Sequence, residues 1–167
     1  MVTAQDSRRD SRLVFHLPRL EGAQWLRTQM LRREITRNKR IIQAALDAWR
    51  NGTGNVFDLL ALDAKWTIVG NAPVSRTYIS RQEFLDVVIK PFNARLSRGL
   101  VPTVRGIYAD GDMVIALFDA EATARDGKPY KNTYTWYMRM RDEKIVEAIA
   151  FFDTVEFTDL WSRIKPE

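Results

Sequence analysis

The stretch DMVIALFDAEATARDGKPYKNTYTWYMRMRDEKIVEAIAFFDT, residues 112–154, decides the predicted fold. It contains three runs typical of long β-strands, at residues 112–125, 130–141 and 144–154. Asp126-Gly127 and Asp142-Glu143 lie at the two reversals, and an Asp-Gly pair between strand-like runs is one of the strongest short signals for a hairpin. The sequence therefore predicts consecutive antiparallel strands.

Alternation separates the two faces of each predicted strand, because successive side chains point to opposite sides of a sheet. In the first strand Asp119 and Glu121 share a face with Ile115 and Leu117, an unusual place for carboxylates. The third strand is apolar on both faces and must be covered on both sides. In the middle strand one face carries the residues that look buried: Asn132, Tyr134, Trp136, Met138 and Met140.

The composition is that expected of one soluble globular domain. The chain has 167 residues, of which 46% are hydrophobic and 28% charged. No apolar run approaches the roughly 20 residues of a membrane span, and the start lacks the apolar core of a signal peptide. We therefore expect a cytoplasmic protein that has no membrane partner.

The scarcity of cysteine and histidine restricts the possible chemistry. Cysteine is absent, and His16 is the only histidine. These facts exclude a Ser-His or Cys-His nucleophile, a cysteine zinc site and any metal site that needs two imidazoles. We expect neither a metal nor an organic cofactor.

The net charge of +5 is concentrated at the start of the chain. Residues 1–40 contain 10 Lys/Arg and 4 Asp/Glu, and the remaining residues are close to neutral. We expect a basic, flexible N-terminal arm at residues 1–22, followed by a single domain at residues 23–167. Contact of the arm with phosphates stays open as a minor alternative. The domain has no basic stripe interleaved with aromatic residues, so we expect no nucleic-acid partner.

Helical patterns dominate the chain before the long strands. Apolar residues recur at spacings of three and four from about Gln24 until Asn51-Gly52, a pair suited to a left-handed helix cap. Helices followed by consecutive strands predict an α+β fold, with helices packed on one face of an antiparallel sheet. The other predicted elements are a helix at residues 56–62, a strand at 65–70, a helix after the N-cap Ser80 and a strand at 101–109.

Three segments resemble the SnoaL-like, ketosteroid-isomerase-related proteins of the nuclear transport factor two-like superfamily: residues 66–84, 126–154 and 157–161. The resemblance covers about residues 36–165. It implies a cone-shaped, strongly curved antiparallel sheet, the cystatin-like or ketosteroid-isomerase-like roll, with helices packed on its concave face. It also implies an apolar pocket on the concave side and a homodimer through the convex side. The superfamily includes isomerases, polyketide cyclases, epoxide hydrolases, dehydratases and members without catalysis, so the fold alone does not decide the activity.

The implied cone assigns side chains to its two sides. If Trp136 faces the concave pocket, the same side is expected to hold further ligand contacts and a candidate acid: Val69, Asn71, Glu121, Asn132, Tyr134, Phe152 and Phe157, with Asp119 and Ala150. The convex side is then expected to carry Phe118, Tyr137, Ile149 and Phe151. Their apolar character calls for a second copy of the chain.

Asp119 is the expected catalytic residue. A carboxylate part-way along an apolar strand face is disfavoured unless it is solvated or paired, and removal from water would suit it to proton transfer near neutral pH. Its position resembles that of an acid in the epoxide-hydrolase branch. The arginine and the second aspartate of that branch correspond here to Leu117 and Ala150. The aspartate base of the isomerase branch corresponds to Asn71.

Two functions follow from these observations. The first is a cofactor-independent isomerase, cyclase or hydrolase, in which Asp119 moves a proton on a carbonyl-containing or polyketide-like apolar substrate. Asn71, Asn132 and Tyr134 would orient that substrate. The second is a non-catalytic ligand-binding or dimerisation domain of the same fold, in which Asp119 is salt-bridged. The expected partners are a small apolar ligand and a second copy of the chain.

Overall fold

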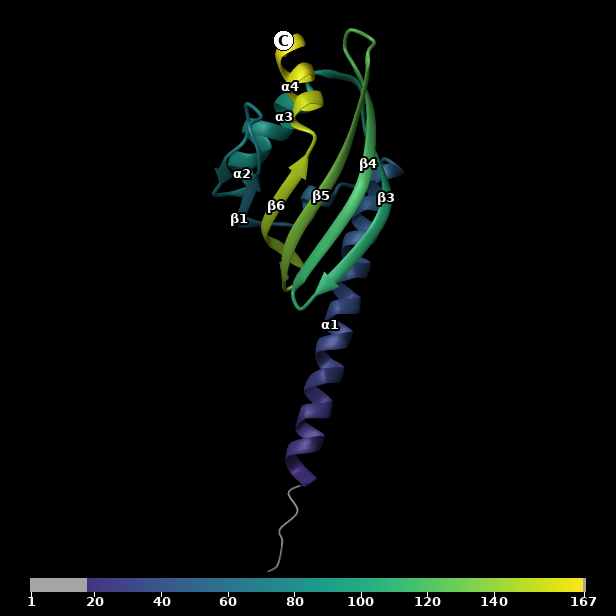
Figure 1. Cartoon of the computed structure of the whole chain (residues 1–167), viewed down its shortest axis with the longest axis vertical. Helices are drawn as coiled ribbons and strands as arrows, with labels where there is room; N and C mark the ends of the chain where they lie inside the picture. The colour runs from purple at the N-terminus through teal and green to yellow at the C-terminus, as the bar shows by residue number, and fades with distance from the viewer. Residues whose placement is uncertain (1–17, 167) are drawn as a thin grey trace, which may run out of the picture.

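A six-stranded sheet forms the body of the molecule (Figure 1). The computed structural model describes residues 18–166, and describes side chains from Gly22 onward. The strands lie in the order β2-β1-β6-β5-β4-β3. Their bounds are β1 (Leu60–Ile68), β2 (Thr77–Tyr78), β3 (Leu96–Asp110), β4 (Met113–Ala124), β5 (Pro129–Arg141) and β6 (Lys144–Phe152). The three long strands predicted from the sequence are confirmed as β4, β5 and β6.

The helices are short except for the first. Their bounds are α1 (Pro18–Arg50), η1 (Val56–Leu59), α2 (Arg81–Phe84), η2 (Leu85–Ile89), α3 (Lys90–Asn93) and α4 (Thr154–Arg163). α2, η2 and α3 follow one another without a break, and η2 is a π-helix. This wider turn ends two residues before Pro91, whose ring and missing N–H do not fit regular α-helical hydrogen bonding. Ser80 caps the segment as predicted, because its hydroxyl accepts a hydrogen bond from the N–H of Glu83 at 3.1 Å.

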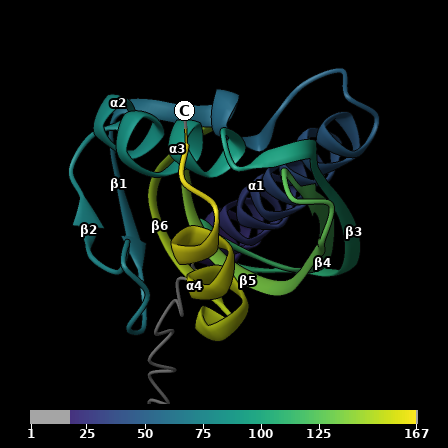
Figure 2. The same cartoon turned by 90° about the horizontal axis from the view of Figure 1, so that it is seen from above.

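The sheet is curved, and the helices cover its concave face (Figure 2). The predicted α+β roll is confirmed. Every neighbouring pair of strands is antiparallel except β1 and β6, which run parallel, so the expectation of a wholly antiparallel sheet is wrong at this pair. β1 and β6 lie far apart in the chain, and no hairpin requires them to be antiparallel.

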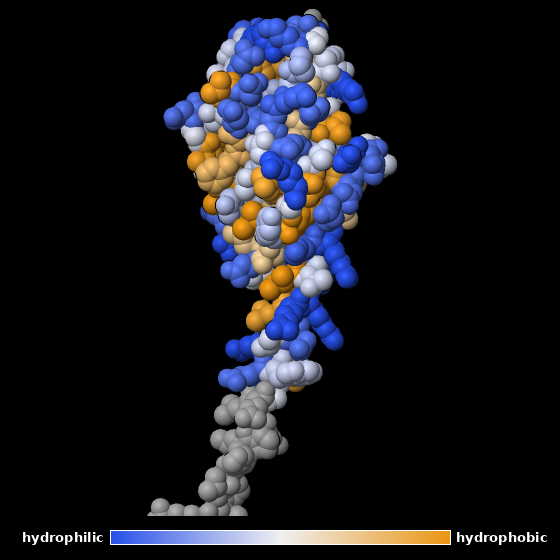
Figure 3. Space-filling model, turned by 45° about the vertical axis from the view of Figure 1, so that its right-hand side comes forward, coloured by the Kyte–Doolittle hydropathy of each residue, from blue (hydrophilic) through white to orange (hydrophobic). Residues whose placement is uncertain are grey.

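α1 begins earlier than the sequence pattern predicts. It starts at Pro18 rather than near Gln24, so the end of the predicted arm is helical, and residues 1–17 of that arm lie outside the described residues. Its second half packs against the body through the buried Ile42 and Leu46. Its first half extends away from the body (Figure 1, Figure 3), and exposes four large apolar side chains: Trp25, Leu26, Met30 and Leu31. Neither α1 nor any other described helix has a stretch apolar enough to cross a lipid bilayer.

Alternate residues of the long strands build the core. The even-numbered residues are buried in β4 from Val114 to Ala124 and in β5 from Tyr130 to Met140. The register pairs Ala116 with Trp136 and Phe118 with Tyr134, and directly opposed residues lie on the same face of a sheet. The concave face is therefore the even-numbered face of both strands.

The turn between β5 and β6 generates a prediction about stability. Asp142 and Glu143 have φ values of 48° and 63°, a left-handed conformation that costs a non-glycine residue about 1–2 kcal/mol. Glu143→Gly creates an Asp-Gly turn, the type favoured in two-residue hairpins. We expect it to raise the free energy of unfolding by about 0.5–1 kcal/mol, because the removed strain exceeds the extra chain entropy of glycine. Urea denaturation followed by circular dichroism measures this change.

Glu143→Ala is the matched control for this variant. Both substitutions remove the exposed 3.6 Å ion pair between Glu143 and Arg37, which contributes little. Alanine keeps the cost of the left-handed backbone, so it should not stabilise the protein. Equal stabilities of the two variants would contradict the role assigned to the backbone conformation.

Candidate functional site

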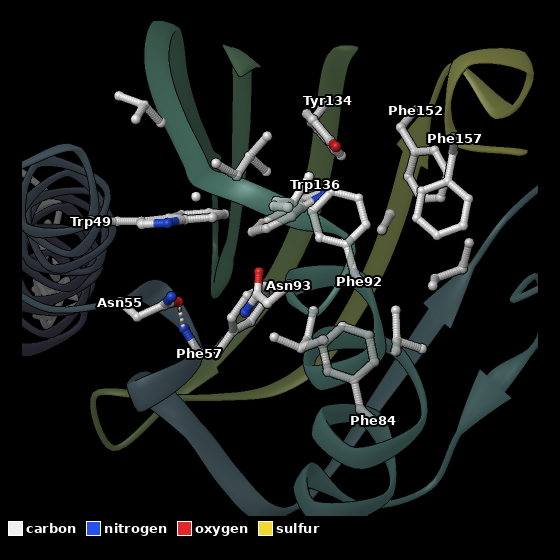
Figure 4. Close-up of a pocket in the computed structure, with 18 of the residues that line it drawn as sticks. Trp49, Asn55, Phe57, Phe84, Phe92, Asn93, Tyr134, Trp136, Phe152 and Phe157 are labelled. Carbon is white, nitrogen blue, oxygen red and sulfur yellow. Dashed lines mark hydrogen bonds between the residues drawn. The ribbon is translucent and has the colours of Figure 1, made fainter. Parts of the chain in front are cut away.

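A cavity of about 450 Å³ lies between the concave face of the sheet and the helices. Figure 4 shows the rings of Trp49, Phe57, Phe84, Phe92 and Trp136 around this space. The first four rings come from α1, η1, α2 and α3, and the last comes from β5. The volume is in the range of pockets that hold small organic molecules.

Aromatic rings support one another around the cavity. Between ring centroids, the indole of Trp136 lies 5.0 Å from Trp66, 5.6 Å from Phe57 and 6.1 Å from Trp49. Trp66 and Phe84 stack at 4.5 Å with an angle of 15° between their planes. Rings packed in this way offer rigid, flat, apolar surfaces. The cavity therefore favours a flat and apolar ligand.

The exposed residues of the cavity lining identify its mouth. Arg50 and Gly52 lie at the end of α1, Asn93 lies at the end of α3, and Arg98 and Gly99 lie near the start of β3. The lining on the sheet side is buried, as Tyr134 and Trp136 of β5 show. The cavity is thus open beside the end of α1 and closed at the sheet.

A series of hydrogen bonds leads from the end of β6 to the cavity wall. The N–H of Asp153 donates to Oδ1 of Asn132 at 2.9 Å. Nδ2 of Asn132 donates to the carbonyl oxygen of Asp153 and to the hydroxyl oxygen of Tyr130, both at 2.9 Å. The hydroxyl oxygens of Tyr130 and Tyr134 are 2.8 Å apart, and Tyr134 lines the cavity. We call Asn132, Tyr130 and Tyr134 the tyrosine relay.

The bonding partners fix the direction of the relay. The backbone of Asp153 offers one donor and one acceptor to Asn132, which sets the orientation of the amide and makes Tyr130 an acceptor of its N–H. Tyr130 is buried, and leaving its own hydroxyl hydrogen without an acceptor would cost about 1–3 kcal/mol. This cost is avoided if Tyr130 donates to Tyr134. The hydroxyl hydrogen of Tyr134 then points to the cavity.

Burial raises the pKa of both tyrosines in the relay. Desolvation raises the pKa of Tyr130 to about 12, against the lowering effect of its hydrogen bonds with Tyr134 and Asn132. Desolvation also raises the pKa of Tyr134 well above its ordinary value, and the neighbouring Tyr130 adds to the increase. Both hydroxyls are therefore protonated at neutral pH. Tyr134 presents a neutral hydrogen-bond donor to the cavity.

The comparison with protein families identifies the fold family. Residues 42–148 match the SnoaL-like domain, which is more than half of the chain. The chain belongs to the SnoaL-like family. The resemblance to SnoaL-like proteins predicted from the sequence is confirmed. A comparison with curated proteins gives no match.

Solved structures share the fold of this SnoaL-like protein at low sequence identity. A nuclear transport factor two-like protein from Burkholderia thailandensis is 21% identical, with a TM-score of 0.61 over 74% of this chain and 95% of its own. TerC, crystallised with polyporic acid, is 21% identical, with a TM-score of 0.60 over 75% and 98% of the two chains. IdmH, a candidate polyketide cyclase from Streptomyces antibioticus, is 24% identical, with a TM-score of 0.57 over 75% and 98%. These structural similarities show that this chain has the same fold as the three proteins.

The structure of the SnoaL-like protein contradicts the predicted position of Asp119. Asp119 is paired with Thr133 in the sheet and lies on the convex face, away from Trp136. Its carboxylate accepts a hydrogen bond from Thr133 at 2.7 Å and lies 3.7 Å from Arg105, with the side chain 47% exposed. Such a carboxylate is solvated and paired. It does not reach the cavity and cannot transfer a proton there.

The predicted positions of Glu121 and Phe118 are wrong for the same reason. Glu121 lies on the convex face and forms an exposed 3.1 Å ion pair with Lys131. Phe118, expected on the convex side, is fully buried on the concave side and stacks with Tyr134 at 5.1 Å. The face predicted for the residues of β4 is therefore wrong: the even-numbered ones lie on the concave face and the odd-numbered ones on the convex face.

The other predicted contacts fall into two groups. Tyr134, Trp136 and Phe152 line the cavity, together with Ala150 and Phe157. The remaining three do not line it: Asn132 is buried behind the wall in the tyrosine relay, Val69 lies beside the lining residue Ile68, and Asn71 is exposed in a separate hollow against α4. Within the described part of the chain, no three His, Cys, Asp or Glu side chains gather in a way that could hold a metal ion.

Sequence reasoning missed Tyr130 and part of the aromatic lining that the helices contribute, including Trp49 and Phe92. Tyr130 lies on the same alternating face as Asn132 and Tyr134, so its position in the relay was readable from the sequence. Trp49 and Phe92 lie on the apolar stripes of their helices. Such a stripe indicates burial, but it does not distinguish a packed core from a cavity wall.

The raised tyrosine pKa values predict how stability depends on pH. Tyrosine has an ordinary pKa of 10.0, and the folded-state pKa of Tyr130 is about 12. Between these values the native protein keeps a proton that the unfolded chain has lost, so the contribution to stability is complete below pH 10 and is lost as the pH rises through 12. The raised pKa of Tyr134 has the same effect on the pH dependence of stability. We expect the free energy of unfolding to fall steeply above pH 10.

Urea denaturation at a series of alkaline pH values measures this fall. The double variant Tyr130→Phe/Tyr134→Phe should show a shallower slope with pH, whatever its absolute stability. Comparing slopes removes the packing effect of the two substitutions. Equal slopes in the wild type and the double variant would contradict the assignment.

Proposed function

We propose that this SnoaL-like protein binds a flat, apolar, carbonyl-containing compound of the polyketide-like class in the aromatic cavity. Tyr134 donates a hydrogen bond to the carbonyl oxygen of this ligand. The tyrosine relay is the observation that carries the proposal, since it leaves the hydroxyl hydrogen of Tyr134 free to donate at the wall of a mainly apolar cavity. A ligand oxygen at this position would satisfy the hydroxyl hydrogen of Tyr134.

Such a donor supports cofactor-independent isomerisation or cyclisation. When a proton leaves the carbon next to a carbonyl, the electron pair moves onto the carbonyl oxygen, and a fixed donor stabilises the resulting enolate. One such donor typically contributes about 10²–10³ to turnover. The described lining residues include no carboxylate and no imidazole. Water at the mouth, or a basic group of the substrate itself, would therefore accept the proton.

Two structural neighbours support this choice of ligand class. IdmH is described as a candidate polyketide cyclase, and TerC was crystallised with polyporic acid. Both chains align with about 75% of this one. A conjugated compound that carries oxygen is therefore the first class to test.

Binding without catalysis is the second candidate function. It is favoured by the same lack of a proton acceptor among the described lining residues. Tyr134 would then orient the ligand and accelerate no reaction. The two functions predict the same affinity and different proton-exchange rates.

The convex face of the sheet supports a homodimer as a further part of the proposal. Two apolar rows cross β4, β5 and β6 on this face: Ile115, Tyr137 and Ile149, and Leu117, Thr135 and Phe151. Ion pairs border them, including Arg139 with Asp112 at 2.9 Å and with Glu147 at 3.1 Å. An apolar centre with a charged rim is typical of a protein interface.

The first prediction for the cavity uses a matched pair of ligands, 1-acetonaphthone and 1-ethylnaphthalene, which differ at the carbonyl. A hydrogen bond of ordinary net strength corresponds to about 5-fold in affinity. Tyr134→Phe should weaken binding of the ketone by about this factor and leave binding of the hydrocarbon unchanged. Quenching of tryptophan fluorescence measures both affinities. Tyr137→Phe on the convex face is the control, and a ketone affinity that is equal in all three proteins would refute the contact.

Exchange of the methyl protons of 1-acetonaphthone in D₂O, followed by NMR, separates catalysis from binding. Catalysis predicts exchange faster than in buffer, slowed about 10²-fold by Tyr134→Phe. Saturable binding with exchange at the buffer rate would instead identify a binding domain.

Phe151 provides the test of the dimer, because it is 45% exposed and lies in one of the two apolar rows of the convex face. Phe151→Glu should convert a dimer to a monomer, since the interface would have to bury an unpaired charge. Light scattering after size-exclusion chromatography measures the mass. Val155→Glu, at a 74% exposed position in α4, is the control that should stay dimeric. A monomeric wild-type protein would contradict the proposal.

A further inference from the structure

Two arginines stand at the mouth of the cavity without an acidic partner. Arg50 is the last residue of α1, Arg98 lies near the start of β3, and both side chains are exposed. They are the charged residues among the described residues that line the cavity, whose other polar side chains, such as Asn93, are neutral. No described carboxylate lies within 4.0 Å of either guanidinium. The mouth therefore carries uncompensated positive charge.

The acids nearest to the mouth in sequence or register are engaged elsewhere. Asp47, three residues before Arg50 in α1, accepts a hydrogen bond from Nε2 of Gln43 at 2.9 Å. Asp58 accepts a hydrogen bond from the backbone N–H of Asn55 at 3.1 Å, as part of the cap of η1. Glu121, opposite Val101 in the register, lines a separate hollow together with Arg98, but its carboxylate pairs with Lys131 at 3.1 Å. None of these three carboxylates forms an ion pair with Arg50 or Arg98.

Local contacts and the strand register constrain the two arginines. Nη1 of Arg50 donates to the hydroxyl of Thr103 at 3.5 Å, a long bond to a neutral group that leaves the charge available. Arg98 lies between two irregularities in the β3–β4 register, which separate it from Leu96 and from Val101. Bulges of this kind redirect side chains and are frequent beside binding sites.

The end of α1 opposes this charge only weakly. A helix C-terminus carries about half a negative charge, whereas each guanidinium carries a full positive charge. Three of the last carbonyl groups of α1 already accept hydrogen bonds, from the N–H groups of Asn51, Gly52 and Thr53. The net field at the mouth is therefore positive and favours anions.

We infer that the cavity selects organic acids: ligands whose flat apolar part enters the aromatic cavity and whose carboxylate or equivalent acidic group stays at the mouth, between Arg50 and Arg98. This inference rests on the proposed function and specifies its substrate class. The acidic group does not enter the cavity, because moving a carboxylate into a dry neutral site costs several kcal/mol. At the mouth the acidic group of the ligand remains hydrated and interacts with two guanidinium cations. The charge thus fixes which end of the ligand enters first.

A pair of fluorescent probes with one aromatic skeleton tests the inference. 8-Anilinonaphthalene-1-sulfonate is anionic, and N-phenyl-1-naphthylamine is the same skeleton without the sulfonate. The double variant Arg50→Gln/Arg98→Gln should weaken binding of the anionic probe about 10-fold, since each partly exposed ion pair contributes up to about 1 kcal/mol. Binding of the neutral probe should change less than about 2-fold. The affinity of the wild type for the anionic probe should also fall with salt, because salt screens exposed charges.

Arg141→Gln is the matched control, because Arg141 is an exposed arginine at the end of β5 that does not line the cavity. It removes one positive charge, where the double variant removes two, and should leave both affinities unchanged. Equal weakening by Arg141→Gln, or no weakening in the double variant, would overturn the inference and leave the proposed function intact. Failure of the wild type to bind the neutral probe would overturn the proposed function itself. Circular dichroism of each variant confirms that the fold is retained.

Discussion

The register between β4 and β5 is the constraint on which the rest of the structure depends. It places Ala116 beside Trp136, Phe118 beside Tyr134 and Ala120 beside Asn132, so that the even-numbered residues of both strands share the concave face. A shift of one residue in β4 would exchange its two faces and bring Asp119 and Glu121 into the core. The cost of burying two carboxylates excludes that arrangement. The same register therefore decides both what lines the cavity and what stays in water.

Much of the fold could be predicted from the sequence, and the failure at β4 has a specific cause. The hairpin at Asp126-Gly127, the Ser80 cap and the long strands all depend on local signals, which alternation and turn chemistry reveal. The face of β4 depends on how β4 pairs with β5, which the Asp-Gly turn alone does not specify. The composition of β4 indicates which of its faces is buried, because its even-numbered residues are all apolar while its odd-numbered ones include both acids. A uniformly apolar set is a better guide to the core than an isolated charge.

The position of Tyr134 depends on parts of the chain that no local pattern connects. Asp153 holds Asn132 through its backbone and caps α4 through its side chain, which accepts a hydrogen bond from the N–H of Val155 at 2.9 Å. α4, which the sequence analysis did not anticipate, brings Phe157 against Phe92 in a stack at 5.7 Å. Asp153, which follows the last strand, thus orients the amide of Asn132. This amide sets the direction of the hydrogen bonds in the tyrosine relay. This coupling depends on tertiary contacts, so the sequence pattern of either segment alone does not predict it.

The concave face shows why a cavity remains in place of a closed core. Across the sheet, Trp136 lies between Ala116 and Ala150, so the one large ring of this row has alanines on both sides. The next row carries Phe118, Tyr134 and Phe152, whose rings support one another and keep the hydroxyl of Tyr134 in place. Large rings that brace one another cannot collapse into the space left by alanines. The result is a rigid apolar space with the hydroxyl of Tyr134 on its wall and positive charge at its mouth. A ligand that satisfies all three features is amphipathic, and the acid of β4 has no part in binding it.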